Sequence, residues 1–172
     1  SLNRWPEAAQ AAERLIDVMP GAYHAHYLLA QYCFEMHNDR DAFYQVNYAL
    51  ELEKGDLGVY VLRLRILLRK GALQQAADDL RFLEDSQCSD YLPVLWCKAL
   101  YAEATDKAVI GPEGSLPDEG KLYDGTPFVL EHGRDAALAI YREIYERLKQ
   151  GEEMDWPGQA CFRLAILSQD EK

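Results

Sequence analysis

Small and apolar residues recur along the chain at an interval of 34 residues, in three parallel series. The series are Ala8, Ala42 and Ala76; Ala12, Val46 and Leu80; and Leu15, Ala49 and Leu83. Within each successive set the spacing is four and then three residues, which places the set on one face of a helix with 3.6 residues per turn. The pattern therefore predicts three helices that repeat every 34 residues.

A second type of helix is predicted between these three. Residues 25–30 and residues 160–165 share one pattern: a small residue, a variable one, an aromatic, a variable one, then Leu and Ala. Because the two types alternate along the chain, we expect them to form helix pairs. A regular succession of such pairs is typical of repeat proteins, in which each unit packs mainly on its neighbours.

This alternation resembles the tetratricopeptide repeat (TPR) family. The second helix of that motif carries Ala, a bulky residue four positions later and a Pro at its end, a pattern met by Ala8, Ala12, Leu15 and Pro20. The next unit has Lys54 in place of the Pro. The resemblance implies an all-α fold, a right-handed α-α superhelix (a TPR-like solenoid) of antiparallel helix pairs.

In the helix predicted after Lys54, two residues depart from the motif. Arg63 stands where the motif prefers Leu, and Leu64 stands where it prefers a small residue. Chain reversals between paired helices are expected at Gly71 and at residues 37–39, His-Asn-Asp, since these residue types favour turns.

The expected map is a single TPR-like helical repeat domain over residues 1–172. It consists of a half repeat at 5–19, two full repeats over 23–85, a third over 90–150 and a final helix at 156–168.

The third repeat is expected to contain an inserted loop at residues 106–130. Ala137, Tyr141 and Ile144 follow the preceding set of the same type by 61 residues, about 27 more than the repeat length. The added piece is rich in Gly and Pro, so it cannot be one continuous helix. We expect it to occlude the groove or to contribute to an interface; the alternative is a surface excursion packed on neighbouring helices.

The net charge and the composition exclude some classes of binding partner as expectations. The formal net charge of −11 disfavours nucleic acid and anionic membrane surfaces, which attract Lys and Arg. The four cysteines have no zinc-site spacing, which is typical of reduced thiols in a cytoplasmic protein, and no run of 18 apolar residues predicts a membrane helix. A protein or peptide partner of unknown identity is the expectation.

No catalytic, metal-binding or cofactor-binding pattern is present in the sequence. His24 and His26 are two residues apart and point in different directions on a helix, and neither His37 nor His132 stands in a ligand motif. Most carboxylates fall on polar helix faces. We therefore expect that the chain is not an enzyme and holds no cofactor or metal.

The resemblance implies that first helices line a concave groove, which would bind a peptide. The residues expected there are His24, Tyr27, Gln31, Phe34, Val61, Arg65, Leu68 and Arg69. Their aromatic, aliphatic and guanidinium groups suit a peptide with apolar anchors and a carboxylate. The alternative is that Arg65 and Arg69 pair with local acids while the aromatic residues pack between repeats.

One function known among TPR proteins is disfavoured by residue type. The positions that would hold the acidic tail of a heat-shock chaperone carry no cation; they are Tyr27, Gln31, Leu62, Leu92 and Trp96. The expected function is a peptide-binding or protein-binding scaffold. The alternative is a regulatory or assembly segment of a larger multidomain protein whose catalytic part lies elsewhere.

Overall fold

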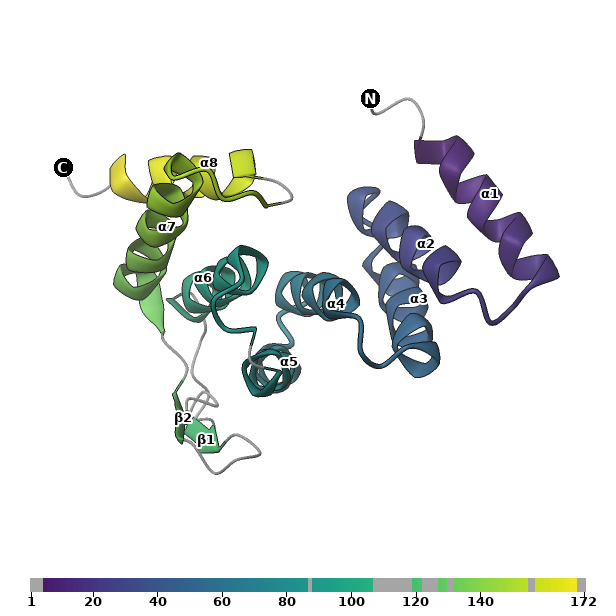
Figure 1. The fold of residues 1–172 in the computed structure, drawn as a ribbon, viewed down its shortest axis with the longest axis horizontal. Helices are drawn as coiled ribbons and strands as arrows, with labels where there is room; N and C mark the ends of the chain where they lie inside the picture. Colours follow the sequence, from purple (N-terminus) through teal and green to yellow (C-terminus); the bar gives the residue numbers. More distant parts are fainter. Residues whose placement is uncertain are drawn as a thin grey trace. The chain divides into compact units, whose positions relative to one another are not determined.

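The computed structural model describes residues 5–86, 88–106, 119–121, 127–129, 132–154 and 157–169. These residues form eight α-helices and one short antiparallel hairpin (Figure 1). The all-α class expected from the sequence is confirmed for this part of the chain. The chain divides into two compact units: unit 1, Ser1–Lys70, and unit 2, Gly71–Lys172.

The helices follow the expected map closely. Unit 1 contains α1 (Trp5–Val18), α2 (Tyr23–Glu35), α3 (Asp39–Leu52) and α4 (Leu57–Arg69). Unit 2 contains α5 (Leu73–Asp85), α6 (Leu92–Asp106), β1 (Glu119–Lys121), β2 (Pro127–Val129), α7 (Gly133–Lys149) and α8 (Pro157–Gln169).

The main core of unit 1 lies where α2, α3 and α4 meet. The periodic set on α3, Ala42, Val46 and Ala49, is fully buried, as the 34-residue pattern predicted. It packs against Ala30 and Phe34 of α2, among other buried residues. The small side chains of the set allow the α2 and α3 backbones to approach closely, and these two helices share an extensive contact.

The buried face of α1 differs from the expectation. Ala9 and Ala12 are buried against Ala25 and Leu29 of α2, whereas Leu15, expected to be buried, is 45% exposed. The substantial helix–helix contact of α1 is with α2. Leu15 is therefore not covered to the extent that the periodic pattern predicted.

The buried face of α4 differs by one residue from the face expected from the TPR resemblance. Leu62, rather than Arg63, enters the apolar cluster, with Val59 and Ile66 on the same face. Arg63 stays half-buried, where its Nη1 donates to Asn47 Oδ1 at 3.3 Å. A guanidinium kept outside the core retains polar partners, which explains why the helix rotates to bury Leu62 instead.

The expected turns are confirmed. Asn38 caps α3 by accepting a hydrogen bond at Oδ1 from the Asp41 amide, and His37 before it adopts a left-handed φ of 58°. Gly71 has a φ of 73° between α4 and α5. Asp56, which sequence reasoning did not single out, caps α4 by accepting from the Gly58 amide at 2.9 Å.

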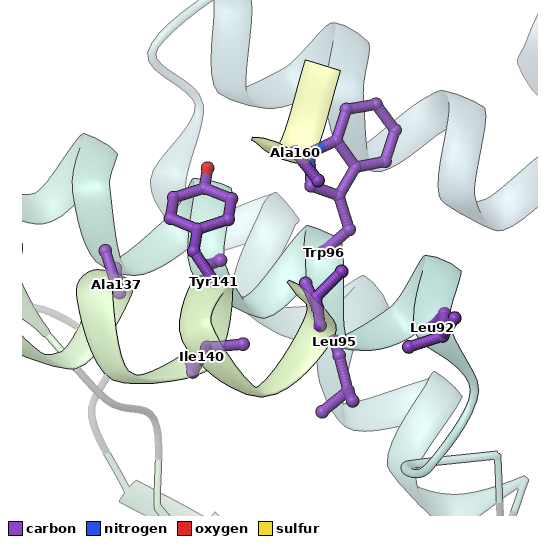
Figure 2. Close-up of a cluster of buried hydrophobic side chains, with 10 residues drawn as sticks. Leu92, Leu95, Trp96, Ala137, Ile140, Tyr141 and Ala160 are labelled. Atoms are coloured by element: carbon purple, nitrogen blue, oxygen red, sulfur yellow. The ribbon is translucent and has the colours of Figure 1, made fainter. Parts of the chain in front are cut away.

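Unit 2 is built around the α6–α7 pair. Ala137, Tyr141 and Ile144 of α7 are buried, as the displaced periodic set predicted. Figure 2 shows Tyr141 in the same apolar cluster as Trp96 of α6 and Ala160 of α8. On α5 the set Ala76, Leu80 and Leu83 is fully buried as well.

The described part of the insertion is a hairpin. Glu119 pairs with Val129 and Lys121 with Pro127 in antiparallel register. The expectation that residues 106–130 are not one continuous helix is confirmed there. The remainder, from 107 to 118 and from 122 to 126, and residue 130 lie outside the described residues.

Candidate peptide-binding site

Four residues predicted to line the groove lie on α2 at spacings of three or four residues, which puts them on one side of the helix. His24 is exposed, Tyr27 and Gln31 are half-buried, and Phe34 is 8% exposed. Gln31 Nε2 donates to Tyr27 Oη at 3.0 Å. This bond fixes the two polar side chains relative to each other in the middle of the row.

Phe34 connects this row with the residues predicted on α4. The Arg65 guanidinium carbon lies 4.7 Å from the centroid of the Phe34 ring, and that of Arg69 lies 3.7 Å from it. Both distances fall within the range of cation–π interactions. The structure therefore brings the two predicted rows together in unit 1, although Phe34 and Arg69 are 35 residues apart in the chain.

Arg69 is held by groups of its own unit. Its Nη2 donates to the Phe34 carbonyl oxygen at 2.7 Å and forms an ion pair with Asp39, and its Nη1 lies 3.4 Å from His37 Nδ1. These contacts fix the guanidinium against the end of α2. A carboxylate from a partner would have to compete with Asp39 for it.

Three of the predicted residues are buried by packing. Val61 is 5% exposed, and Phe34 and Arg65 are 8% exposed each. The alternative interpretation, in which the aromatic residue packs and an arginine pairs with a local acid, describes Phe34 and Arg69 correctly. The predicted residues with accessible surface are His24, Tyr27, Gln31, Leu68 and Arg69. Their role in peptide binding stays a prediction.

Sequence reasoning missed an acidic rim beside His24. The Tyr23 and His24 rings lie 3.9 Å apart between centroids, tilted by 47°. Desolvation, together with the nearby carboxylates of Asp56 and Glu53, raises the pKa of Tyr23 above its usual value. Asp56 precedes α4 and Glu53 follows α3, so only the tertiary structure places both beside α2. The predicted row thus has carboxylates at the His24 end and Arg69 at the other.

His26 is engaged in packing. Its ring is 5% exposed, lies 4.4 Å from the Tyr48 ring, and has Nδ1 at 2.7 Å from Gln45 Oε1. Nε2 lies 3.0 Å from the Pro20 carbonyl oxygen, which can only accept a hydrogen bond. The histidine therefore links α2, α3 and the turn that follows α1.

Unit 2 contains a buried polar cluster that the sequence did not reveal. Glu103 of α6 forms an ion pair with Arg163 of α8 at 2.6 Å and accepts from Tyr141 Oη of α7 at 3.3 Å. Burial, and then the Glu103 charge, raise the pKa of Tyr141 well above its usual value. The tyrosine hydroxyl therefore stays protonated and continues to donate. A Glu directly after the buried Ala102 in an apolar stretch is the signal that could have suggested this cluster.

Within the described ranges, no group of three or more His, Cys, Asp or Glu side chains could hold a metal ion. None of the described helices combines the length and apolar character needed to cross a membrane. Comparison with protein-family models, curated proteins and solved structures finds no match to this chain. The fold defines an all-α protein of successive helix pairs, and membership of the TPR family stays a prediction.

Proposed function

We propose that the chain is a TPR-like right-handed superhelix whose first helices bind a peptide or a protein segment. The surface involved is the α2–α4 face, defined here as His24, Tyr27, Gln31, Leu68 and Arg69. The observation that carries the proposal is the Phe34 contact with Arg65 and Arg69, which sets the α2 row beside the α4 row.

The chemistry of the α2–α4 face supports an extended peptide. Tyr27 presents a large, partly exposed ring with few rotatable bonds, a residue type enriched in binding hot spots. The Gln31 amide beside it can bond to a peptide backbone, because its Nε2 has a second hydrogen and its oxygen accepts. Leu68 adds an aliphatic contact for an apolar anchor.

The charges suggest a preferred peptide direction. Asp56 and Glu53 lie at the His24 end, and Arg69 lies at the other. A peptide with a basic residue toward His24 and an acidic residue toward Arg69 would be electrostatically complementary. Arg69 already forms an ion pair with Asp39. An acidic residue of the peptide would therefore contribute less to the binding free energy than the apolar residue of the peptide that contacts Leu68.

A selection from a random-peptide display library with the full chain tests this function. The enriched peptides should bind the purified chain with a Kd that rises about tenfold or more in Tyr27→Ala and about threefold in Gln31→Ala, as expected of a central aromatic and its polar neighbour. Tyr44→Ala is the matched control, because Tyr44 is 65% exposed on α3, outside the face, and its loss should leave the Kd unchanged.

Enriched peptides whose affinity is equal for the Tyr27→Ala and Tyr44→Ala variants would show that the α2–α4 face is not the site. Substitution of Arg65 is unsuitable for this test, because Arg65 is buried on Phe34 and its removal would disturb the fold.

A further inference from the structure

A surface hollow in unit 2 is formed by residues other than those predicted to bind a peptide. The hollow has a volume of about 410 Å³. It is formed by residues at the start of α6 and by residues at and after the end of α7. The lining residues are Asp90, Tyr91, Leu92, Pro93, Arg147, Glu152 and Glu153. Most of its lining surface is apolar, since Leu92, Pro93 and the Tyr91 ring contribute to it.

An exposed aromatic side chain stands at this hollow. Tyr91 is 61% exposed, whereas Leu92, which follows it, is 3% exposed and belongs to the α6–α7 core. Leu92 and Pro93 therefore give the hollow a floor anchored in the core. The ring of Tyr91 is left accessible to a ligand, and the face of such a ring attracts cations.

The charges of the hollow are unbalanced. Three carboxylates and one guanidinium give it a formal charge of −2. Arg147 is committed to Glu152, with Nε donating to Oε1 at 2.9 Å and Nη2 donating to Oε2 at 2.7 Å. No hydrogen bond or ion pair within the described part of the chain engages the Asp90 or Glu153 carboxylate. Two carboxylates and an aromatic face therefore remain for a ligand.

Arg147 shows how a guanidinium fits among these groups. Hydrogen bonding to Glu152, and then the charges of Glu152, Glu143 and Asp90, raise the pKa of Arg147. Its binding to Glu152 is bidentate, the geometry in which arginine and carboxylate match best. The same local field would act on a second guanidinium brought in by a partner.

From this geometry we infer that the hollow binds an arginine side chain of a partner peptide, with Tyr91 stacking on the guanidinium and Asp90 and Glu153 neutralising it. The aliphatic stem of the arginine and an adjacent apolar residue lie on Leu92 and Pro93. Complementarity of charge selects this occupant, because the hollow is negative and the whole chain carries −11. This surface is separate from the α2–α4 face and does not depend on it.

The probe is the capped peptide acetyl-Gly-Leu-Arg-Leu-Gly-amide, titrated into the ¹⁵N-labelled full chain at low salt and followed by NMR. Amide signals of Tyr91, Leu92 and Glu153 should shift together and saturate. The peptide with citrulline in place of arginine, which keeps the shape but loses the charge, should bind about tenfold more weakly, as expected of charge-assisted bonds. Addition of salt should lower the affinity of the arginine peptide more than that of the citrulline peptide.

Variants assign the contacts. Tyr91→Ala should raise the Kd of the probe about three- to fivefold. The double variant Asp90→Asn, Glu153→Gln should raise it about tenfold or more. Glu51→Gln is the matched control, since Glu51 is an exposed carboxylate on α3 outside unit 2 and its loss should leave the affinity unchanged. Tyr27→Ala should also leave it unchanged, which separates this result from the test of the α2–α4 face.

Three outcomes would overturn the inference. The first is equal binding of the arginine and citrulline peptides, and the second is equal or tighter binding of a peptide with Glu in place of Arg. The third is shifts at the hollow that depend on the protein concentration alone, which would mean that a second copy of the chain occupies it.

Discussion

The Arg69 guanidinium stacks on the Phe34 ring and donates to the Phe34 carbonyl oxygen, 35 residues earlier in the chain. One side chain thus engages both the ring and the backbone of one residue. That carbonyl belongs to the last turn of α2, where it also accepts a hydrogen bond from the His37 amide at 3.1 Å, so Arg69 is a further donor to it. The contact fastens the end of α4 to the end of α2.

Arg69→Ala should lower the free energy of unfolding by about 1–2 kcal/mol, because it removes a cation–π contact, a hydrogen bond to a carbonyl and an ion pair with Asp39. Urea denaturation followed by circular dichroism measures the change. Arg40→Ala, at an exposed position on α3, should change stability by less than about 0.5 kcal/mol. Equal effects of the two substitutions would show that the Phe34 contact contributes nothing.

His26→Ala should destabilise the chain by about 2 kcal/mol, because the half-buried Gln45 side chain and the Pro20 carbonyl each lose a partner and the ring leaves a void beside Tyr48. Thermal unfolding is a suitable measurement. The neighbouring His24→Ala provides the comparison: His24 is exposed, so its loss should leave the melting temperature nearly unchanged. A melting temperature equally lowered by both would contradict the assignment.

Arg163→Ala should destabilise the chain by about 1–3 kcal/mol, because it leaves the Glu103 carboxylate buried without its guanidinium. The range is below that of fully buried pairs since the Arg163 side chain is 40% exposed. Adding Glu103→Leu to Arg163→Ala should recover part of the loss by removing the unpaired charge. A double variant that is less stable than Arg163→Ala would contradict this account.

Hydrogen bonding to Arg147 lowers the pKa of Glu152 below its ordinary value. A lowered carboxyl pKa contributes stability above the pKa of the unfolded chain, and that contribution is lost as the pH falls through the folded-state pKa. Arg147→Ala should raise the Glu152 pKa toward the ordinary value for glutamate. A ¹³C NMR titration of the carboxyl measures it. Lys149→Ala should leave the Glu152 pKa unmoved, because Lys149 pairs with Glu146 instead.

Gly71→Ala should destabilise the chain by about 1 kcal/mol through backbone strain alone, because Gly71 has a φ of 73° and an added Cβ would meet no atom within 4 Å. Gly21→Ala is the matched control, since that glycine also has open space but no positive φ. Chemical denaturation should show Gly21→Ala to be neutral or slightly stabilising. A neutral Gly71→Ala would contradict the left-handed turn.

The second helices of the repeat were predictable because their burial is a local, periodic property. Val46, Leu80 and Tyr141 are all buried, and each stands in the periodic set that identified its helix. Turn chemistry was equally local: Asn38 bonds to a backbone amide only three residues away. In these cases the side chain and its structural role lie within one turn of the helix, so the residue pattern is sufficient.

The candidate site could be predicted only in outline. The spacing placed Tyr27 and Gln31 on one side of α2, and they do form a hydrogen bond there. The spacing did not predict that Phe34 and Arg65 would be buried, because their exposure depends on residues far away in the chain. The cluster formed by Glu103 with Arg163 escaped prediction for the same reason, since 60 residues separate the partners.

The sequence by itself determined the order and approximate position of the helices, which face of α3, α5 and α7 is apolar, and where the chain turns, because helical periodicity and turn preferences act over a few residues. Only the tertiary structure decided which face of α1 is buried and that Leu62 replaces Arg63 in the core. Those outcomes depend on which neighbouring helix is available to pack against. An apolar side chain is buried where such a neighbour covers it, and a charged side chain stays where it keeps its polar partners.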